Sequence, residues 1–251
     1  MTSPVVNTSH HSHDGSPSLS FVKALELLKS RQKPGEGVPA YTRWINRGLA
    51  RYVAAGAFRI GIRPNAVTAI SALVSGIGLV VLVMAPRTIS TGILVAVILA
   101  AGYLLDSADG QVARLSEQSS RAGEWLDHVV DAVRMPLIHL CTLVALFLEG
   151  VENWVLVLPL AYSVTITGQF FSQILAKQLA SAGTRPTPNS GQSLFLLPTD
   201  TGVLCWIFVL WGLPKLFLVS YALLLGVNLV HTAVSMRRRF RQLNVPTAGR
   251  P

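Results

Sequence analysis

The stretch from Ile89 to Asp131, ISTGILVAVILAAGYLLDSADGQVARLSEQSSRAGEWLDHVVD, combines an apolar run with a group of aspartates. Its first part, Ile89 to Leu105, approaches the ~20 residues that a helix needs to cross a bilayer. The run ends in carboxylates, and the next apolar run begins among further carboxylates. Acidic groups so close to lipid are costly and are usually functional. The stretch therefore predicts two successive membrane helices with a functional site where their ends meet.

The rest of the chain is also built from long apolar runs. It is 51% hydrophobic and only 13% charged, with a mean hydropathy of +0.48, whereas soluble domains carry about 25% charged residues. An ordinary cytosolic enzyme is therefore disfavoured. A sixth run, around Leu194 to Trp211, is interrupted at Pro198 to Asp200 and is expected to begin near Thr199. We expect an all-α integral membrane protein with six transmembrane helices preceded by an interfacial amphipathic helix; the other runs are Asn65 to Met84, Ala132 to Leu148, Trp154 to Leu175 and Leu216 to Val234.

The distribution of basic residues predicts the topology. Lys and Arg outnumber Asp and Glu by 21 to 12. With six spans, the outside loops carry only Arg87 and Lys215. Because cytoplasmic loops are enriched in Lys and Arg, both termini and the acidic site are expected on the cytoplasmic side. No basic stripe interleaved with aromatic residues is present, so nucleic acid is not expected as a partner.

Composition divides the chain into four expected regions. Residues 1–18 form a polar, disordered tail, and residues 19–63 form interfacial amphipathic helices with basic residues beside apolar ones. The transmembrane catalytic domain covers residues 64–236, and a basic cytoplasmic tail covers residues 237–251. Cys141 and Cys205 lie inside apolar runs and are expected to be small buried side chains.

The aspartates have the spacing of a metal site. Asp106 and Asp109 are three residues apart, and Asp127 and Asp131 are four apart, so each pair shares one face of a helix. Four facing carboxylates would repel one another unless cations neutralised them. Hard oxygen ligands favour Mg²⁺, Mn²⁺ or Ca²⁺ over zinc, and such ions beside an arginine suit a phosphate or pyrophosphate. The alternative is a set of solvated ion pairs with Arg114, Arg121 and Arg134.

The same residues resemble the signature of the CDP-alcohol phosphotransferase family. That signature reads Asp, two residues, Asp-Gly, two residues, Ala-Arg, eight residues, Gly, three residues, Asp, three residues, Asp, and this chain matches every fixed position from Asp106 to Asp131. The Pro64-Asn65-Ala66-Val67-Thr68 segment is similar to the family's Pro-Asn-x-x-Thr entry into the first span. The resemblance implies six transmembrane helices after an interfacial helix, which agrees with the hydropathy pattern.

The resemblance also implies roles for individual residues. The four aspartates, Asp106, Asp109, Asp127 and Asp131, would hold two divalent ions, Mg²⁺ or Mn²⁺, and Asp131 would be the general base. The cytidine-diphosphate pocket would be lined by Gly110, Ala113, Arg114 and Gly123, with Ser120, Asn65 and Thr68 nearby. The implied reaction transfers a phosphatidyl group from CDP-diacylglycerol or another CDP-alcohol to a polar alcohol and releases CMP, in a homodimer within the lipid bilayer.

One position departs from several phosphatidyltransferases of the family. They place Arg directly after the final Asp, whereas here Ala132 follows Asp131 and the nearest arginine is Arg134. This departure weighs against an acceptor of the inositol-phosphate type.

A polar stripe on the fourth span is the candidate acceptor site. Thr165, Gln169, Gln173 and Lys177 recur every four residues on an otherwise apolar helix, so they are expected to face the bundle interior or a wet cavity. An acceptor phosphate would be received by Lys177, Arg134 or Arg185. Simple hydrogen bonding between helices explains the stripe equally well.

The sequence leaves two other functions open. Within the same class, the enzyme would take a soluble CDP-alcohol and transfer its phospho-alcohol head group to a lipid acceptor. In a different class, a cation or proton transporter would use the intramembrane acids, but the small residues and Arg114 then have no evident purpose.

Overall fold

The computed structural model describes residues 19–32, 35, 37–179, 193 and 196–244. Within these residues the chain is helical and contains no strand. Five helical segments are long and apolar enough to cross a membrane, which confirms the all-α membrane fold. They are α3 (Pro64–Met84), α4 (Ile89–Leu115), α5 (Arg121–Leu148), α6 (Val157–Leu179) with the preceding 3-10 turn η2 (Asn153–Leu156), and α9 (Pro214–Leu243).

The sixth expected crossing is shorter than the others. It consists of α8 (Thr201–Ile207) and the 3-10 turn η4 (Phe208–Leu210), after a 3-10 turn η3 (Leu197–Thr199). Ten helical residues rise only about 15 Å, which is half of a bilayer core. Asp200 caps the helix, which starts at Thr201, within two residues of the expected start near Thr199.

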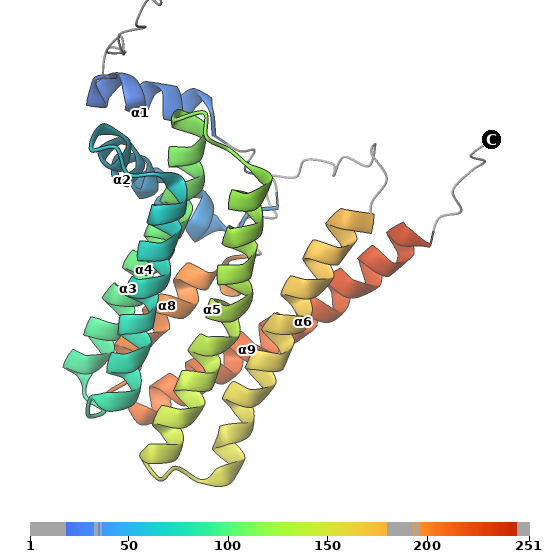
Figure 1. Cartoon of the computed structure of the whole chain (residues 1–251). Coiled ribbons are helices and arrows are strands. Elements are labelled where there is room, and N and C mark those ends of the chain that lie inside the picture. Colours follow the sequence, from blue (N-terminus) through green and yellow to red (C-terminus); the bar gives the residue numbers. More distant parts are fainter. Residues whose placement is uncertain (1–18, 33–34, 36, 180–192, 194–195, 245–251) are drawn as a thin grey trace, which may run out of the picture.

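This short segment runs antiparallel to α4 along half of its length. At one end Gly92 of α4 lies so close to Phe208 that an added Cβ would be 2.4 Å from the Phe208 carbonyl oxygen. At the other end Asp200 and Tyr103 share a hydrogen-bond partner, Thr42. The chain therefore reverses direction before α9, and the last turns of α9 lie at the same end of the molecule as the α4–α5 loop (Figure 1).

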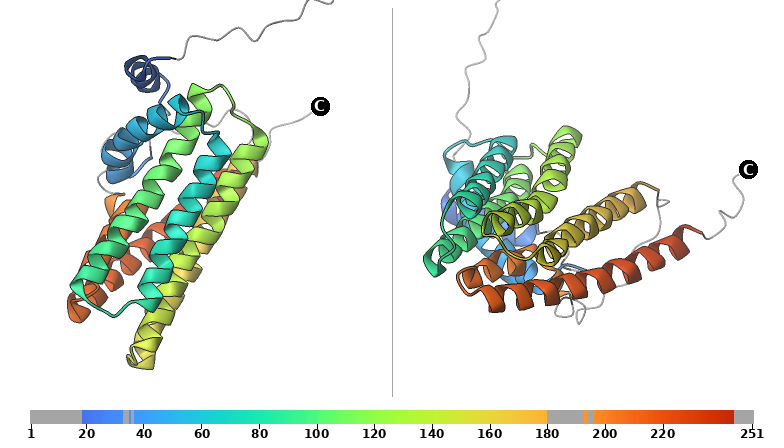
Figure 2. Two further views of the ribbon diagram at one scale, coloured as in Figure 1. Left: turned by 60° about the vertical axis from the view of Figure 1, so that its left-hand side comes forward. Right: turned by 90° about the horizontal axis from the view of Figure 1, so that it is seen from below.

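That end of the molecule, which we call the α2 end, also carries the amphipathic segments. These are α1 (Phe21–Ser30), the π-helical turn η1 (Tyr41–Asn46) and α2 (Arg47–Arg59). They lie over the ends of the long helices (Figures 1 and 2). Small alanines of α2 pack with Leu28 of α1 and Val112 of α4 in a separate apolar core, while Trp44 and Leu49 remain exposed.

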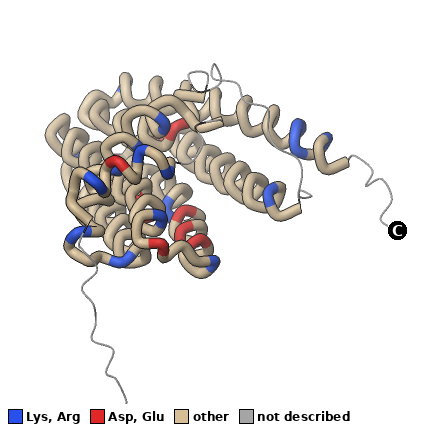
Figure 3. The backbone as a smooth tube through the Cα atoms, turned by 90° about the horizontal axis from the view of Figure 1, so that it is seen from above, with Lys and Arg blue, Asp and Glu red and all other residues tan. Residues whose placement is uncertain are grey.

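Basic residues are spread over the α2 end and along the last turns of α9 (Figure 3). α9 continues as a helix to Leu243, through the first part of the expected basic tail. The polar tail expected at residues 1–18 lies outside the described residues.

A buried polar clasp connects the amphipathic segment to the short helix. Asp200 accepts hydrogen bonds from the backbone N–H of Thr42, the hydroxyl of Thr42 and the N–H of Gly202, at 2.8, 2.8 and 2.9 Å. The Thr42 hydroxyl lies 2.6 Å from the hydroxyl of Tyr103 on α4. Asn46 extends the network by donating to Ser107, at 2.6 Å. The clasp thus ends beside Asp106, in the middle of the acidic stretch.

Replacing Asp200 with Ala is expected to lower the free energy of unfolding by about 2 to 3 kcal/mol, because three donors lose a charged acceptor in a buried place. The measurement is the thermal unfolding midpoint of the purified protein in detergent. Thr167→Ala is the control, since its hydroxyl donates to the Ser163 carbonyl within α6. Equal midpoints for Asp200→Ala and the wild type would show that the clasp does not hold the two segments together.

Candidate active site

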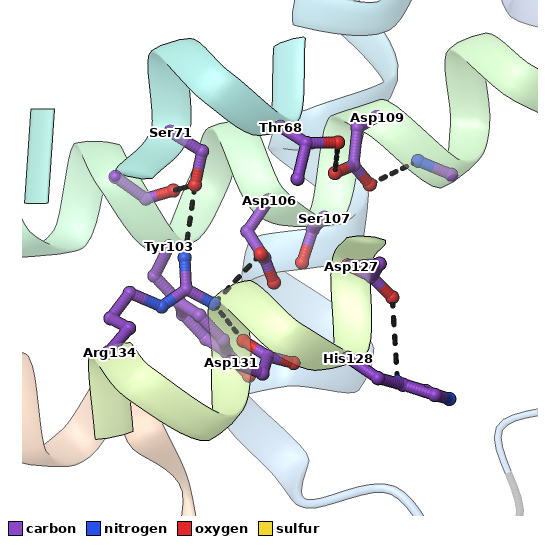
Figure 4. A network of polar contacts seen from close by, with 12 residues as sticks. Thr68, Ser71, Tyr103, Asp106, Ser107, Asp109, Asp127, His128, Asp131 and Arg134 are labelled. Atoms are coloured by element: carbon purple, nitrogen blue, oxygen red, sulfur yellow. Dashed lines mark hydrogen bonds and ion pairs between the residues drawn. The ribbon is translucent and has the colours of Figure 1, made fainter. Parts of the chain in front are cut away.

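The aspartates lie at the α2 end, on the last turns of α4 and the first turns of α5. Ser120 starts α5 by accepting a hydrogen bond from the Gly123 N–H at 3.0 Å. A short loop joins the two helices (Figure 1), and the acid-bearing turns lie side by side (Figure 4). Asp106, Asp109 and Asp127 each offer a carboxylate oxygen, and these oxygens lie within 4.8 Å of one another. Three carboxylate donors at this spacing fit a hard divalent cation such as Mg²⁺ or Mn²⁺.

Asp109 is the most tightly held of the three. It is 5% exposed, and its Oδ2 accepts a hydrogen bond of 2.6 Å from the hydroxyl of Thr68 on α3. Its Oδ1 accepts from the N–H of Gly110. The buried hydroxyl fixes the direction of the carboxylate, and such outer partners commonly tune metal affinity. Thr68 was expected near the nucleotide; in the structure its hydroxyl contacts the acid.

Asp131 shares an arginine partner with Asp106. The Arg134 guanidinium, one turn further along α5, forms an ion pair with Asp131 and lies 2.8 Å from Asp106 Oδ1. Its other terminal nitrogen donates to Ser71 on α3 at 3.0 Å. Three of the four aspartates therefore form the candidate metal group, while Asp106 and Asp131 share an arginine (Figure 4).

The expected nucleotide-pocket residues lie next to this group. A Cβ on Gly110 would be 3.5 Å from Arg114 Nη1, so the arginine folds back over the glycine. A Cβ on Gly123 would lie 3.2 Å from Ser120 Oγ and 3.3 Å from Asn65 Oδ1. Ala113 is half-buried on the same turns of α4. The start of α3 and the start of α5 thus meet at Gly123, as the implied pocket requires.

A second arginine, Arg47 of α2, adds positive charge beside Arg114. The two guanidinium groups are close enough to repel each other. Burial lowers the pKa of the Arg47 guanidinium from its ordinary value, and its backbone carbonyl accepts from Gln111 of α4 at 3.1 Å. Two like charges held together favour an anion nearby. From the sequence, Arg47 was expected only to be one of the basic residues in the interfacial region of residues 19–63.

The polar stripe of α6 is divided between two places. Gln169 and Gln173 line a cavity of about 530 Å³ bounded by α5, α6, α8 and α9. Lys177 lies instead at a neighbouring groove, where it pairs with Glu124 at 2.8 Å. Arg134 belongs to the acidic group, and Arg185 lies outside the described residues. The glutamines are therefore the acceptor candidates that reach the cavity.

The far wall of this cavity is formed by α9, which was expected from the sequence to be a membrane span followed by a basic tail. Its contribution is His231, Ser235, Arg238 and Arg239. The signal was present in their spacing of three and four residues, which places them on one helix face. The His231 ring nitrogen lies 3.1 Å from the Gln169 amide nitrogen, which joins the two walls.

Comparison with known proteins agrees with this geometry. The family model described as CDP-alcohol phosphatidyltransferase matches residues 62–234. The chain belongs to this family. It is therefore a membrane enzyme of the phosphatidyltransferase class, and the transporter alternative is set aside. No curated protein matches the sequence significantly.

A solved structure shares the fold of this phosphatidyltransferase. The crystal structure of Mycobacterium tuberculosis phosphatidylinositol phosphate synthase (PgsA1) with CDP-DAG bound is 21% identical, with a TM-score of 0.55, covering 82% of this chain and 98% of that chain. At this identity the likeness is evidence for the fold.

Thr68→Val is expected to weaken Mn²⁺ binding by this phosphatidyltransferase about tenfold, because Asp109 loses the donor that orients it. Affinity is measured by titrating the purified, metal-stripped protein and detecting free Mn²⁺. Thr68→Ser keeps the hydroxyl and should retain the wild-type affinity. Wild-type affinity in Thr68→Val would show that the hydroxyl does not orient Asp109.

Proposed function

We propose that the enzyme transfers a phosphatidyl group from CDP-diacylglycerol to a polar alcohol, releases CMP and depends on a divalent metal ion. The observation that carries the proposal is the convergence of Asp106, Asp109 and Asp127 beside Arg114, in a chain of this family. The solved structure with the same fold has CDP-DAG bound, which favours the lipid-linked donor over a soluble CDP-alcohol.

The donor diphosphate would lie between the acidic group and the arginines. Arg114 and Arg47 would bind its oxygens, while Gly110 and Gly123 leave space for the nucleotide next to the backbone. Asp106, Asp109 and Asp127 would hold the ion. When bound there, the ion supplies Lewis-acid stabilisation of negative charge on the phosphoryl oxygens.

Asp131 would act as the general base. The acceptor hydroxyl gives its proton to the Asp131 carboxylate as its oxygen attacks the phosphorus that carries the lipid. A new P–O bond forms, the phosphoanhydride bond breaks, and CMP leaves with the bonding electrons. The Arg134 ion pair would orient the Asp131 carboxylate beside the reaction centre.

The acceptor would enter from the 530 Å³ cavity, where Gln169, Gln173 and His231 offer hydrogen bonds and Arg238 and Arg239 offer positive charge. Tyr103 and Met135, each near an acid of the site along its own helix, also line this cavity. The cavity therefore lies within about one helical turn of Asp106 and Asp131, although none of the four site aspartates lines it. The positive-inside pattern favours the cytoplasmic side for this end and for both termini. We further propose that the enzyme is a homodimer, as the family resemblance implies.

The reaction is tested by CMP release from purified protein in lipid with Mg²⁺ or Mn²⁺, offering CDP-diacylglycerol with a panel of alcohols. We expect CMP release with one class of alcohol and none after metal removal. Release only from a soluble CDP-alcohol with diacylglycerol would support the alternative donor, and silence with every donor would contradict phosphatidyl transfer.

Asp131→Asn is expected to reduce kcat by about 10² to 10⁴, because the amide cannot take the acceptor proton. Glu117→Gln is the matched control, since it exchanges an acid for an amide at the same end of the bundle, on a side chain that is 78% exposed. A kcat within about threefold of the wild type for Asp131→Asn would assign the base to another group.

A further inference from the structure

The acidic site contains its own positive charge. Four carboxylates meet at the ends of α4 and α5, but only three of them form the group that fits a cation. The fourth, Asp131, faces Arg134, and so does one oxygen of Asp106. The carboxylates therefore divide between a candidate ion and a guanidinium.

One atom of Arg134 lies between the two acids. Nη2 is 2.8 Å from Asp106 Oδ1 and also forms the ion pair with Asp131 Oδ1. A divalent ion that bridged these oxygens would need to lie about 2.1 Å from each of them, in the space that this nitrogen occupies. The geometry thus excludes a second ion at that place while the arginine stays.

The arginine is held there by its surroundings. Its side chain is 7% exposed, and Nη1 donates to Ser71 Oγ, which itself donates to the Gly102 carbonyl at 2.9 Å. A buried guanidinium that lost its carboxylates would be an uncompensated charge, which is strongly unfavourable. An incoming ion would therefore have to displace a well-anchored cation.

We infer that Arg134 takes the place of a second metal ion, so that each chain binds one divalent ion, on Asp106, Asp109 and Asp127. Asp131 is then held by an arginine, and Arg134 is a positioning residue rather than a site for the acceptor phosphate. This inference rests on the proposed metal dependence and specifies its stoichiometry.

The first test counts Mn²⁺ bound to metal-stripped, purified enzyme by electron paramagnetic resonance of the free ion. We expect one ion per chain at saturation. Asp109→Asn should weaken binding at least tenfold, whereas Asp131→Asn should change the affinity less than twofold and leave the stoichiometry at one. Two ions in the wild type, or the loss of an ion in Asp131→Asn, would overturn the inference.

The second test removes the positive charge of Arg134. In Arg134→Gln, Asp106 and Asp131 are free for an ion, so the count should rise to two and Mn²⁺ should raise the unfolding temperature more than in the wild type. Arg134→Lys keeps one positive charge and should still bind one ion. A count of one in a folded Arg134→Gln protein would contradict the inference. If Arg134→Gln does not fold, the number of Mn²⁺ ions bound by Asp131→Asn is the measurement that supports or overturns the inference.

The outcomes also separate the inference from the proposed function. No Mn²⁺ binding and no metal-dependent CMP release would refute the metal-dependent reaction itself. Metal-dependent CMP release with two bound ions would leave the reaction standing and refute only the role of Arg134.

Discussion

A guanidinium buried between aspartates at the mouth of a membrane helix must keep its partners, because an unpaired charge in that environment is far more costly than a surface charge. Arg134 satisfies this constraint with contacts to three helices: Ser71 of α3, Asp106 of α4 and Asp131 of α5. The acid-bearing turns of α4 and α5 are therefore fixed relative to each other by the charges that the chemistry requires. Asp109 and Asp127 lie beside these fixed turns, close to Asp106.

This arrangement of acids depends on how closely α3 and α4 approach each other. A Cβ on Gly102 would lie 2.2 Å from Ser75 Oγ and 3.3 Å from the Ser71 carbonyl oxygen. The absent side chain lets Ser71 reach the Gly102 carbonyl, and small residues of this kind are typical of tightly packed membrane helices. The same closeness allows Thr68, one turn earlier on α3, to reach Asp109. A glycine remote from the chemistry thus positions two of the hydroxyls that orient the site.

The sequence predicted the parts of this arrangement that depend on spacing along one helix. Aspartates three and four residues apart share a face, and apolar length sets the spans, so the fold follows directly. All four aspartates were expected to form one metal site, and three of them form the compact group. Contacts between different helices could not be predicted from the sequence. Arg134 was assigned to an acceptor phosphate because its spacing does not reveal that Ser71 and Asp106 lie opposite. The Thr42 to Asp200 clasp joins residues far apart in the chain, and no local pattern marks it.

The two halves of the catalytic site rest on different packing. The acids, Arg134 and Thr68 belong to the closely packed α3, α4 and α5. The proposed acceptor cavity is bounded by α5, α6, α8 and α9. Polar contacts also join α6 and α9, from Gln169 to His231 and Thr232, from Asn228 to Tyr162 and from Arg239 to the Ser172 carbonyl, but none of these contacts involves an aspartate of the site. Side chains on α6 and α9 can therefore change without disturbing the acidic group. In the proposed reaction, this separation would let the residues that select the acceptor change on α6 and α9, while the residues that hold the reacting atoms on α3, α4 and α5 stay in place.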